Sequence, residues 1–231
     1  MPDRWQLDMA ALAASTASPG ASDAPATAPT ELRLEEQDAP ATPFDLFGRW
    51  LDEAFAAGLL WPHVTVLATA TADGIPSART VMLERFDPSG FVFHTNLNSP
   101  KSQDLAKNPR AALVFLWSAL GRQVRIDGGV VPASRAETEA YFQGSPRGIQ
   151  VMLNACANQS DIIPSRAALE AVYAEALARF AAGPVPIPPH LGGLRIVPET
   201  FEFFQARPNN LQDRLRYTRG GASWRLERLV P

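Results

Sequence analysis

The sequence has little of several features that mark whole classes of proteins. Its 231 residues include a single cysteine, Cys156. No disulfide can therefore form within the chain, and a reducing compartment such as the cytoplasm is expected. No apolar run approaches the roughly 18 residues of a membrane helix, so no membrane partner is expected. The net charge is only −3, which argues against nucleic acid as the main partner.

Motifs of metal and nucleotide sites are missing as well. The three histidines, His63, His94 and His190, lack the spacing of metal ligands, and the chain contains neither HExxH nor CxxC. It also has no glycine-rich P-loop and no GxGxxG after a strand. We therefore expect no metal site and no Rossmann-type cofactor site.

Composition divides the chain into two parts. Residues 15–42 are rich in alanine, serine, threonine and proline, a composition that buries too little apolar surface to offset the entropy of ordering. We expect residues 1–42 to form a flexible N-terminal arm, and residues 43–231 to form a single folded domain.

Apolar periodicity within 43–231 predicts a mixture of helices and antiparallel strands. Helical spacing runs from Phe44 to Leu60, and a long Ala/Leu/Glu helix is expected from Ser165 to Ala181. Ser134 and Glu137 have the spacing of a capping box at another helix start. The expected strands are 63–72, 78–86, 91–95, 111–117, 123–131, 194–205 and the hairpin 215–217 with 224–229. Many antiparallel strands with a few inserted helices predict an α+β barrel.

Several polar residues in this pattern are suited to binding an anion or a polar ring. Arg79 lies inside an apolar strand, so its side chain faces either the barrel or a ligand. Lys101 follows Ser99-Pro100 in the first turn of a helix, where the helix dipole and the cation act together on an anion.

The order and spacing of several motifs make the chain resemble the pyridoxamine 5'-phosphate oxidases and their split-barrel flavin relatives. The resemblance extends from about Pro43 to Pro231. The motifs are Ala78-Arg79-Thr80-Val81-Met82-Leu83, Val92-Phe93-His94-Thr95-Asn96, Ser99-Pro100-Lys101, Arg122-Gln123-Val124, Tyr141-Phe142, Pro146-Arg147, Gln159-Ser160, Gly192-Gly193 and Asp213-Arg214-Leu215-Arg216-Tyr217.

The resemblance implies an α+β antiparallel split β-barrel with peripheral helices, and FMN at a homodimer interface. It implies that Arg79 and Lys101 bind the FMN phosphate with Thr95 and Ser160, and that Gln123, Gln159 and Arg214 contact the flavin. The residues that it assigns to the cofactor site are Arg79, Thr80, Val81, Met82, His94, Thr95, Lys101, Gln123, Gln159, Ser160, Phe204 and Arg214. His94, Pro100 and Phe204 differ from the tyrosine, arginine and indole that are usual in the family.

The substrate side departs further from the family pattern. Vitamin B6 oxidases hold the substrate phosphate with a lysine, a tyrosine, an arginine and a serine, and only the tyrosine is retained here. Their Arg-x-His pair beside the pyridoxal ring is also replaced. The substrate-positioning candidates are Glu84, Tyr141, Ser145, Ile149, Asn210 and Gln212. No residue is identified as a general base.

These departures lead to three hypotheses. The first is an FMN-dependent oxidase that removes two electrons from a small amine or a reduced heteroaromatic substrate, in the manner of phenazine-biosynthetic relatives, with O₂ as acceptor. The second is a pyridoxine/pyridoxamine 5'-phosphate oxidase in which Arg147 or Arg207 supplies the missing positive charge. The third is a flavin-binding protein without turnover.

Overall fold

The computed structural model describes residues 33–208 and 210–231. Its helices are η1 (Glu36–Asp38), α2 (Pro43–Ala56), α3 (Pro100–Lys107), η2 (Ser118–Leu120), α4 (Arg135–Gly144), α5 (Arg147–Ala155) and α6 (Arg166–Arg179). Its strands are β1 (Val64–Ala70), β2 (Pro76–Met82), β3 (Arg85–Asp87), β4 (Gly90–Asn96), β5 (Arg110–Trp117), β6 (Arg122–Pro132), β7 (Leu191–Gln205), β8 (Asp213–Gly220) and β9 (Ser223–Arg228).

The nine strands form one antiparallel sheet in the order β2-β1-β5-β6-β7-β4-β3, and the β8–β9 hairpin continues from β7. The long strand β7 pairs with β4 through Leu191–Ile196 and with β8 through Thr200–Gln205. Register with β6 shifts between Asp127 and Gly128, where a Cβ would lie 2.0 Å from the Val197 oxygen. Only glycine fits there, and the irregularity marks the region where β7 passes from one partner strand to the other.

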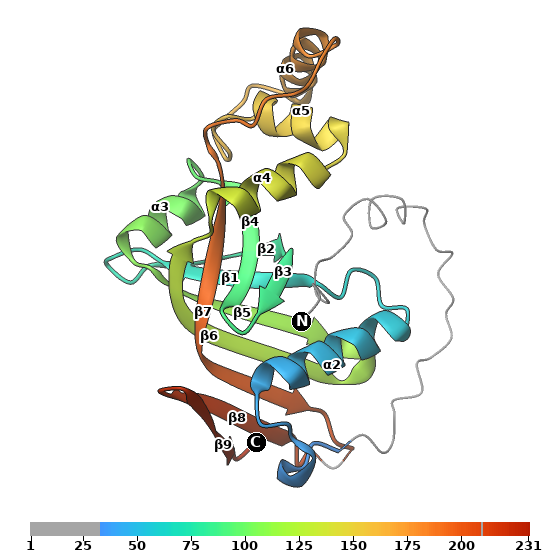
Figure 1. Ribbon diagram of the computed structural model, residues 1–231, viewed down its shortest axis with the longest axis vertical. Coiled ribbons are helices and arrows are strands. Elements are labelled where there is room, and N and C mark those ends of the chain that lie inside the picture. The colour runs from blue at the N-terminus through green and yellow to red at the C-terminus, as the bar shows by residue number, and fades with distance from the viewer. Residues whose placement is uncertain (1–32, 209) are drawn as a thin grey trace.

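An aromatic core closes the sheet against α2. Phe47 lies on the buried face of α2 and makes edge contacts with Phe86, Phe91 and Phe115 at centroid distances of 4.9–5.0 Å. The helix begins where the Thr42 hydroxyl accepts a hydrogen bond from the Asp45 amide. Figure 1 shows α4, α5 and α6 stacked at one end of the molecule and the β8–β9 hairpin at the other.

The expected α+β class is confirmed, and so is the capping box, in which both reciprocal Ser134–Glu137 bonds are present. The predicted strand 78–86 is wrong as one unit, because β2 ends at Met82 and β3 begins at Arg85. The break consists of two residues, and Glu84, the second of them, belongs to neither strand. Helix α5 was not predicted.

The expected boundary at Pro43 is too late. Leu34 is buried in the main core, and η1 is held to the C-terminal strand by Arg228. Residues 33–42 are therefore part of the folded unit, while the rest of the expected arm, 1–32, lies outside the described residues.

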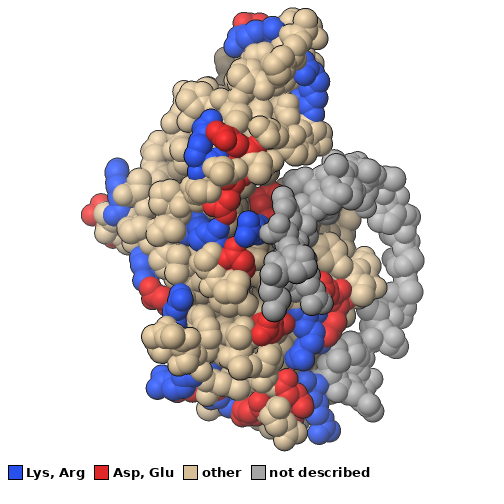
Figure 2. Space-filling model, viewed as in Figure 1, with Lys and Arg blue, Asp and Glu red and all other residues tan. Residues whose placement is uncertain are grey.

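The described helices include none that is long and apolar enough to cross a membrane, and the described residues contain no cluster of three or more His, Cys, Asp or Glu side chains suited to a metal. On the face in Figure 2, basic and acidic side chains are interspersed.

Candidate active site

Two cations from separate elements come together near the start of α3. The Arg79 guanidinium donates to the Thr69 hydroxyl at 2.9 Å and to the Leu67 carbonyl at 3.2 Å. Lys101 Nζ donates to the Ser99 hydroxyl at 3.1 Å and to Gln159 Oε1 at 2.7 Å. We call this group, Arg79 with Lys101 and Gln159, the cationic cleft.

The two neighbouring positive charges make this cleft a candidate anion site. Burial, followed by the charge of Arg79, lowers the pKa of Lys101 to about 8. Burial also lowers the pKa of Arg79, with Asp104 opposing the effect. Like charges held together at a helix start are stabilised when an anion binds between them.

The backbone around the cleft is fixed by Asn96 at the end of β4. Its amide donates to the carbonyls of Cys156 and Ala157, both at 2.9 Å, and this ties down the loop before Gln159. Ser160 has a φ of 79°, in the left-handed region, and is exposed beside Gln159. Thr95 is buried next to Asn96.

The three cofactor candidates at the end of β2 have different environments. Val81 packs against the core, whereas Thr80 and Met82 are exposed on the other face of the strand. This alternation places Val81 on the face of Arg79.

A second group of cofactor candidates forms a row across three strands. Gln123 on β6 is paired with Phe204 on β7, which in turn is paired with Arg214 on β8. Arg214 donates to the buried Glu202 carboxylate at 2.6 and 3.0 Å and to the Val230 carbonyl at 2.9 Å. Among the described residues no hydrogen bond or ion pair joins this row to the cationic cleft.

The substrate candidates Glu84, Tyr141 and Ser145 meet beside His94. The rings of His94 and Tyr141 are stacked, with centroids 4.2 Å apart and planes 3° from parallel. The Ser145 hydroxyl donates to the Tyr141 carbonyl at 2.8 Å where α4 ends. We call these four residues the Glu84 pocket. Ile149, the fourth phosphate-side candidate, is exposed on α5.

Burial dominates the protonation states in this pocket. It raises the pKa of Glu84 to about 7, and it raises that of Tyr141 to about 12 with help from the charge of Glu84. It lowers the pKa of His94 to about 4, against the opposing charge of Glu137, so the imidazole is neutral at pH 7.

Several groups in this pocket lack partners. Neither imidazole nitrogen of His94 has a hydrogen-bond partner. Within the described ranges, no hydrogen bond or ion pair reaches the carboxylate of Glu84, whose backbone amide bonds to Val92. Unsatisfied polar groups of this kind make the cluster a candidate binding site.

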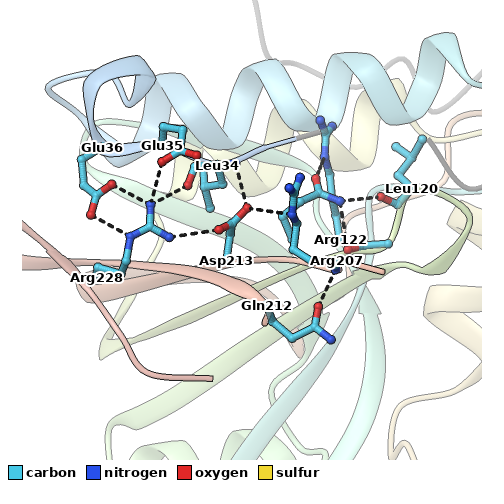
Figure 3. Close-up of polar contacts among 11 residues, drawn as sticks. Leu34, Glu35, Glu36, Leu120, Arg122, Arg207, Gln212, Asp213 and Arg228 are labelled. Atoms are coloured by element: carbon cyan, nitrogen blue, oxygen red, sulfur yellow. Dashed lines mark hydrogen bonds and ion pairs between the residues drawn. The ribbon is translucent and has the colours of Figure 1, made fainter. Parts of the chain in front are cut away.

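The remaining substrate candidates, Asn210 and Gln212, lie in the turn before β8. Asn210 has a φ of 56°, and the Gln212 carboxamide oxygen accepts from the Arg207 amide at 2.5 Å. Next in the chain, Asp213 accepts from the Leu34 amide at 3.2 Å and from Arg228 at 3.0 Å (Figure 3).

Arg228 completes this network and was not predicted from the sequence. Arg228 also donates to both Glu36 carboxylate oxygens at 2.6 and 2.7 Å (Figure 3). These hydrogen bonds from Arg228 lower the pKa of Glu36 to about 2. Glu36 and Arg228 are 192 positions apart, so no local signal could have revealed the pair.

The two arginines that sequence reasoning offered as substitute cations are engaged elsewhere. Arg147 donates to the Phe180 carbonyl at the end of α6, and Arg207 lies 3.7 Å from the Asp213 carboxylate. Among the described residues, Arg147 makes no hydrogen bond or ion pair with Glu84, Tyr141 or Ser145.

Comparison with family models identifies the family of the chain. Residues 51–180, more than half of the chain, match the model described as pyridoxamine 5'-phosphate oxidase. The chain belongs to this family. Residues 192–231 match the pyridoxine 5'-phosphate oxidase C-terminal dimerisation region. The pyridoxamine 5'-phosphate oxidase family uses FMN, so the protein is an FMN-dependent oxidase, and the expectation of a flavin-binding protein without turnover is set aside.

Individual members of the pyridoxamine 5'-phosphate oxidase family are similar over most of their length. The pyridoxine/pyridoxamine 5'-phosphate oxidase of Rubrobacter xylanophilus is 50% identical over 203 residues, which is 87% of this chain and 93% of the relative. The corresponding enzyme of Bordetella petrii is 48% identical, over 86% of this chain and 93% of the relative. The crystal structure of PhzG from Burkholderia lata 383 in complex with tetrahydrophenazine-1-carboxylic acid superposes on this chain with a TM-score of 0.81. The two chains are 34% identical, and the match covers 87% of this chain and 98% of the PhzG chain. The split-barrel fold is thereby shown.

Proposed function

We propose that this FMN-dependent oxidase removes two electrons from a small amine or reduced heteroaromatic substrate that carries no phosphate. The observation that carries the proposal is the Glu84 carboxylate beside Tyr141, at the position where the resemblance to vitamin B6 oxidases calls for a lysine. We further propose that the protein acts as a homodimer in which both chains build each site. The electron acceptor is O₂.

The cationic cleft fits the phosphate of FMN. Arg79 and Lys101 supply two positive charges, and Thr95 and Ser160 lie on segments adjoining the cleft and supply hydroxyls. When bound, FMN supplies the capacity to accept two electrons from the substrate and to return them to O₂. Gln123, Gln159, Phe204 and Arg214 would hold its ring. The lack of any bond between the Gln123 row and the cleft within one described chain supports a site completed by the second chain.

The Glu84 pocket argues against a phosphate ester. The residues at the two expected cation positions, Glu84 and Ser145, provide one carboxylate and one hydroxyl. Each lost charge-assisted hydrogen bond is worth about 1.5–3 kcal/mol. Two such losses weaken phosphate binding by about two to four orders of magnitude. The engagement of Arg147 and Arg207 elsewhere supports this conclusion.

A related structure supports a heteroaromatic substrate. The PhzG crystal structure contains tetrahydrophenazine-1-carboxylic acid, a partly reduced ring system without phosphate. Its coverage of 87% of this chain makes a similar substrate class reasonable here.

The second candidate function is that of a pyridoxine/pyridoxamine 5'-phosphate oxidase. It is the function named for relatives that are 48–50% identical to this chain, and the comparisons by themselves favour it over the first. Retention of Tyr141 also supports it. The two candidates therefore rest on different evidence, overall similarity for the second and pocket chemistry for the first.

One titration separates the two functions. The protein is purified in air, its flavin spectrum is recorded, and pyridoxine 5'-phosphate is added while flavin bleaching and H₂O₂ are followed. We expect a yellow protein that this compound does not bleach but that a reduced heteroaromatic compound or an amine does. Efficient bleaching with stoichiometric H₂O₂ would establish the second function instead.

A further inference from the structure

The Glu84 carboxylate is a charged group without a partner in a partly buried place. Glu84 follows β2 in the two-residue break before β3, and its amide is held by the Val92 carbonyl at 3.0 Å. A partly buried carboxylate is stabilised when a cation or hydrogen-bond donors lie beside it. Because the described part of the chain provides no such group, a ligand is the natural partner.

The basic side chains on the adjoining strands are already paired. Arg85, the next residue, lies 3.0 Å from the Asp87 carboxylate. Arg195 on β7 lies 3.1 Å from Asp87 and 2.5 Å from Glu137. Among the described residues, no ion pair joins either arginine to Glu84, so neither neutralises its charge directly.

The ring pair that lies near Glu84 is aromatic and uncharged. His94 and Tyr141 form a flat stacked pair, and both are neutral at pH 7. Such a wall repels no cation, and the face of a tyrosine attracts one. A carboxylate opposite an aromatic face is a common way to recognise an ammonium group.

We propose that Glu84 binds the protonated amino group of the substrate, with the His94–Tyr141 pair as the wall along which the attached ring lies. Glu84 is thus a specificity-determining residue, and the substrate class narrows to a small aromatic or heteroaromatic amine. This inference rests on the proposed function and deepens it.

Two commercially available probes test the charge preference. Pyridoxamine and pyridoxine share one ring and differ by an amino group in place of a hydroxyl, and neither carries a phosphate. Binding is measured by calorimetry at pH 8, with the full-length protein loaded with FMN and the flavin reduced by dithionite so that no turnover occurs. A charge-assisted contact predicts that the wild type binds pyridoxamine about 10- to 100-fold more tightly than pyridoxine.

Two variants locate the origin of the preference. Glu84→Gln keeps the shape of the side chain and should bring the two affinities to within about threefold. Glu139→Gln is the matched control, because Glu139 lies on the same helix as Tyr141 but pairs with Arg135 at 2.8 Å, and it should keep the wild-type preference. An equal affinity for both probes in the wild type, no measurable binding of pyridoxamine, or a preference that survives in Glu84→Gln would each overturn the proposal.

The failure of this inference is distinguishable from failure of the proposed function. The binding measurement uses no turnover, whereas the proposed function is tested by bleaching with pyridoxine 5'-phosphate. If Glu84→Gln keeps the amine preference but pyridoxine 5'-phosphate still does not bleach the flavin, only the role of Glu84 falls. If pyridoxine 5'-phosphate is oxidised efficiently, the proposed function falls whatever the calorimetry shows.

Discussion

The cationic cleft and the Glu84 pocket are built from neighbouring segments yet have opposite electrostatic character. In the cleft, Arg79 and Lys101 lie close together, and burial, followed by the charge of Arg79, lowers the pKa of the lysine to about 8. In the pocket, burial raises the pKa of Glu84 to about 7. Arg79 lies in β2, and Glu84 lies in the two-residue break that follows this strand. Residues for cofactor and substrate recognition can therefore change independently within one short segment of the chain.

The largest effect is expected from removing one of the two positive charges of the cleft. Arg79→Ala should lower FMN affinity by about 100-fold or more, because it deletes a charge-assisted contact and the geometry that Arg79 imposes through Thr69. Fluorescence titration of the apoprotein with FMN measures the change, and the melting temperature should fall with it. Arg110→Ala is the control, since Arg110 forms an exposed pair with Glu199. Retention of the yellow colour after dialysis of Arg79→Ala would contradict the assignment.

The next test converts the pocket. Glu84→Lys combined with Ser145→Arg should raise the affinity for pyridoxal 5'-phosphate by about 10- to 100-fold, because two positive charges replace a carboxylate and a hydroxyl. Equilibrium dialysis of the FMN-bound protein measures this affinity, and an unchanged flavin spectrum serves as the check on folding. An unchanged affinity would mean that the phosphate of the ligand does not lie in the Glu84 pocket.

A third test asks whether the unpaired carboxylate costs stability. A raised pKa means that folded Glu84 holds its proton more tightly than unfolded Glu84, so the stability it contributes is lost as the pH rises from 4.5 to about 7. Relative to the wild type, Glu84→Gln should be about 3 kcal/mol more stable at pH 8 than at pH 4. Urea unfolding at both pH values measures the difference.

Glu139→Gln should show no such pH dependence. A Glu84→Gln variant whose stability follows the wild type at both pH values would show that the carboxylate is already satisfied in the assembled protein.

The smallest effect is expected in the cleft. Lys101 loses its proton as the pH rises through about 8, so FMN affinity should fall by up to about tenfold between pH 7.5 and 9.5. Lys101→Arg should remove this dependence, because arginine remains charged throughout that range. A Lys101→Arg profile that matches the wild type would assign the titration to another group.

How far sequence reasoning reached depended on the range of the interactions. The capping box of α4 was predicted because its partners, Ser134 and Glu137, are three residues apart. The start of the folded part was misplaced because Leu34 is buried only through contacts with distant segments, including Arg228. The break between β2 and β3 was missed because residues 78–86 alternate well enough for a continuous strand.

The sequence alone determined which chemical groups are present at the site: an arginine and a lysine for an anion, and a glutamate in place of a substrate-binding cation. The types of these residues and their order along the chain are given directly by the sequence motifs. Only the tertiary structure decided which charges are left without partners. Arg147 and Arg207 are satisfied by Phe180 and Asp213, whereas Glu84 is not satisfied by any described residue. The interaction energy of two charges falls as the distance between them grows. For residues far apart in the chain, this distance is fixed only by folding.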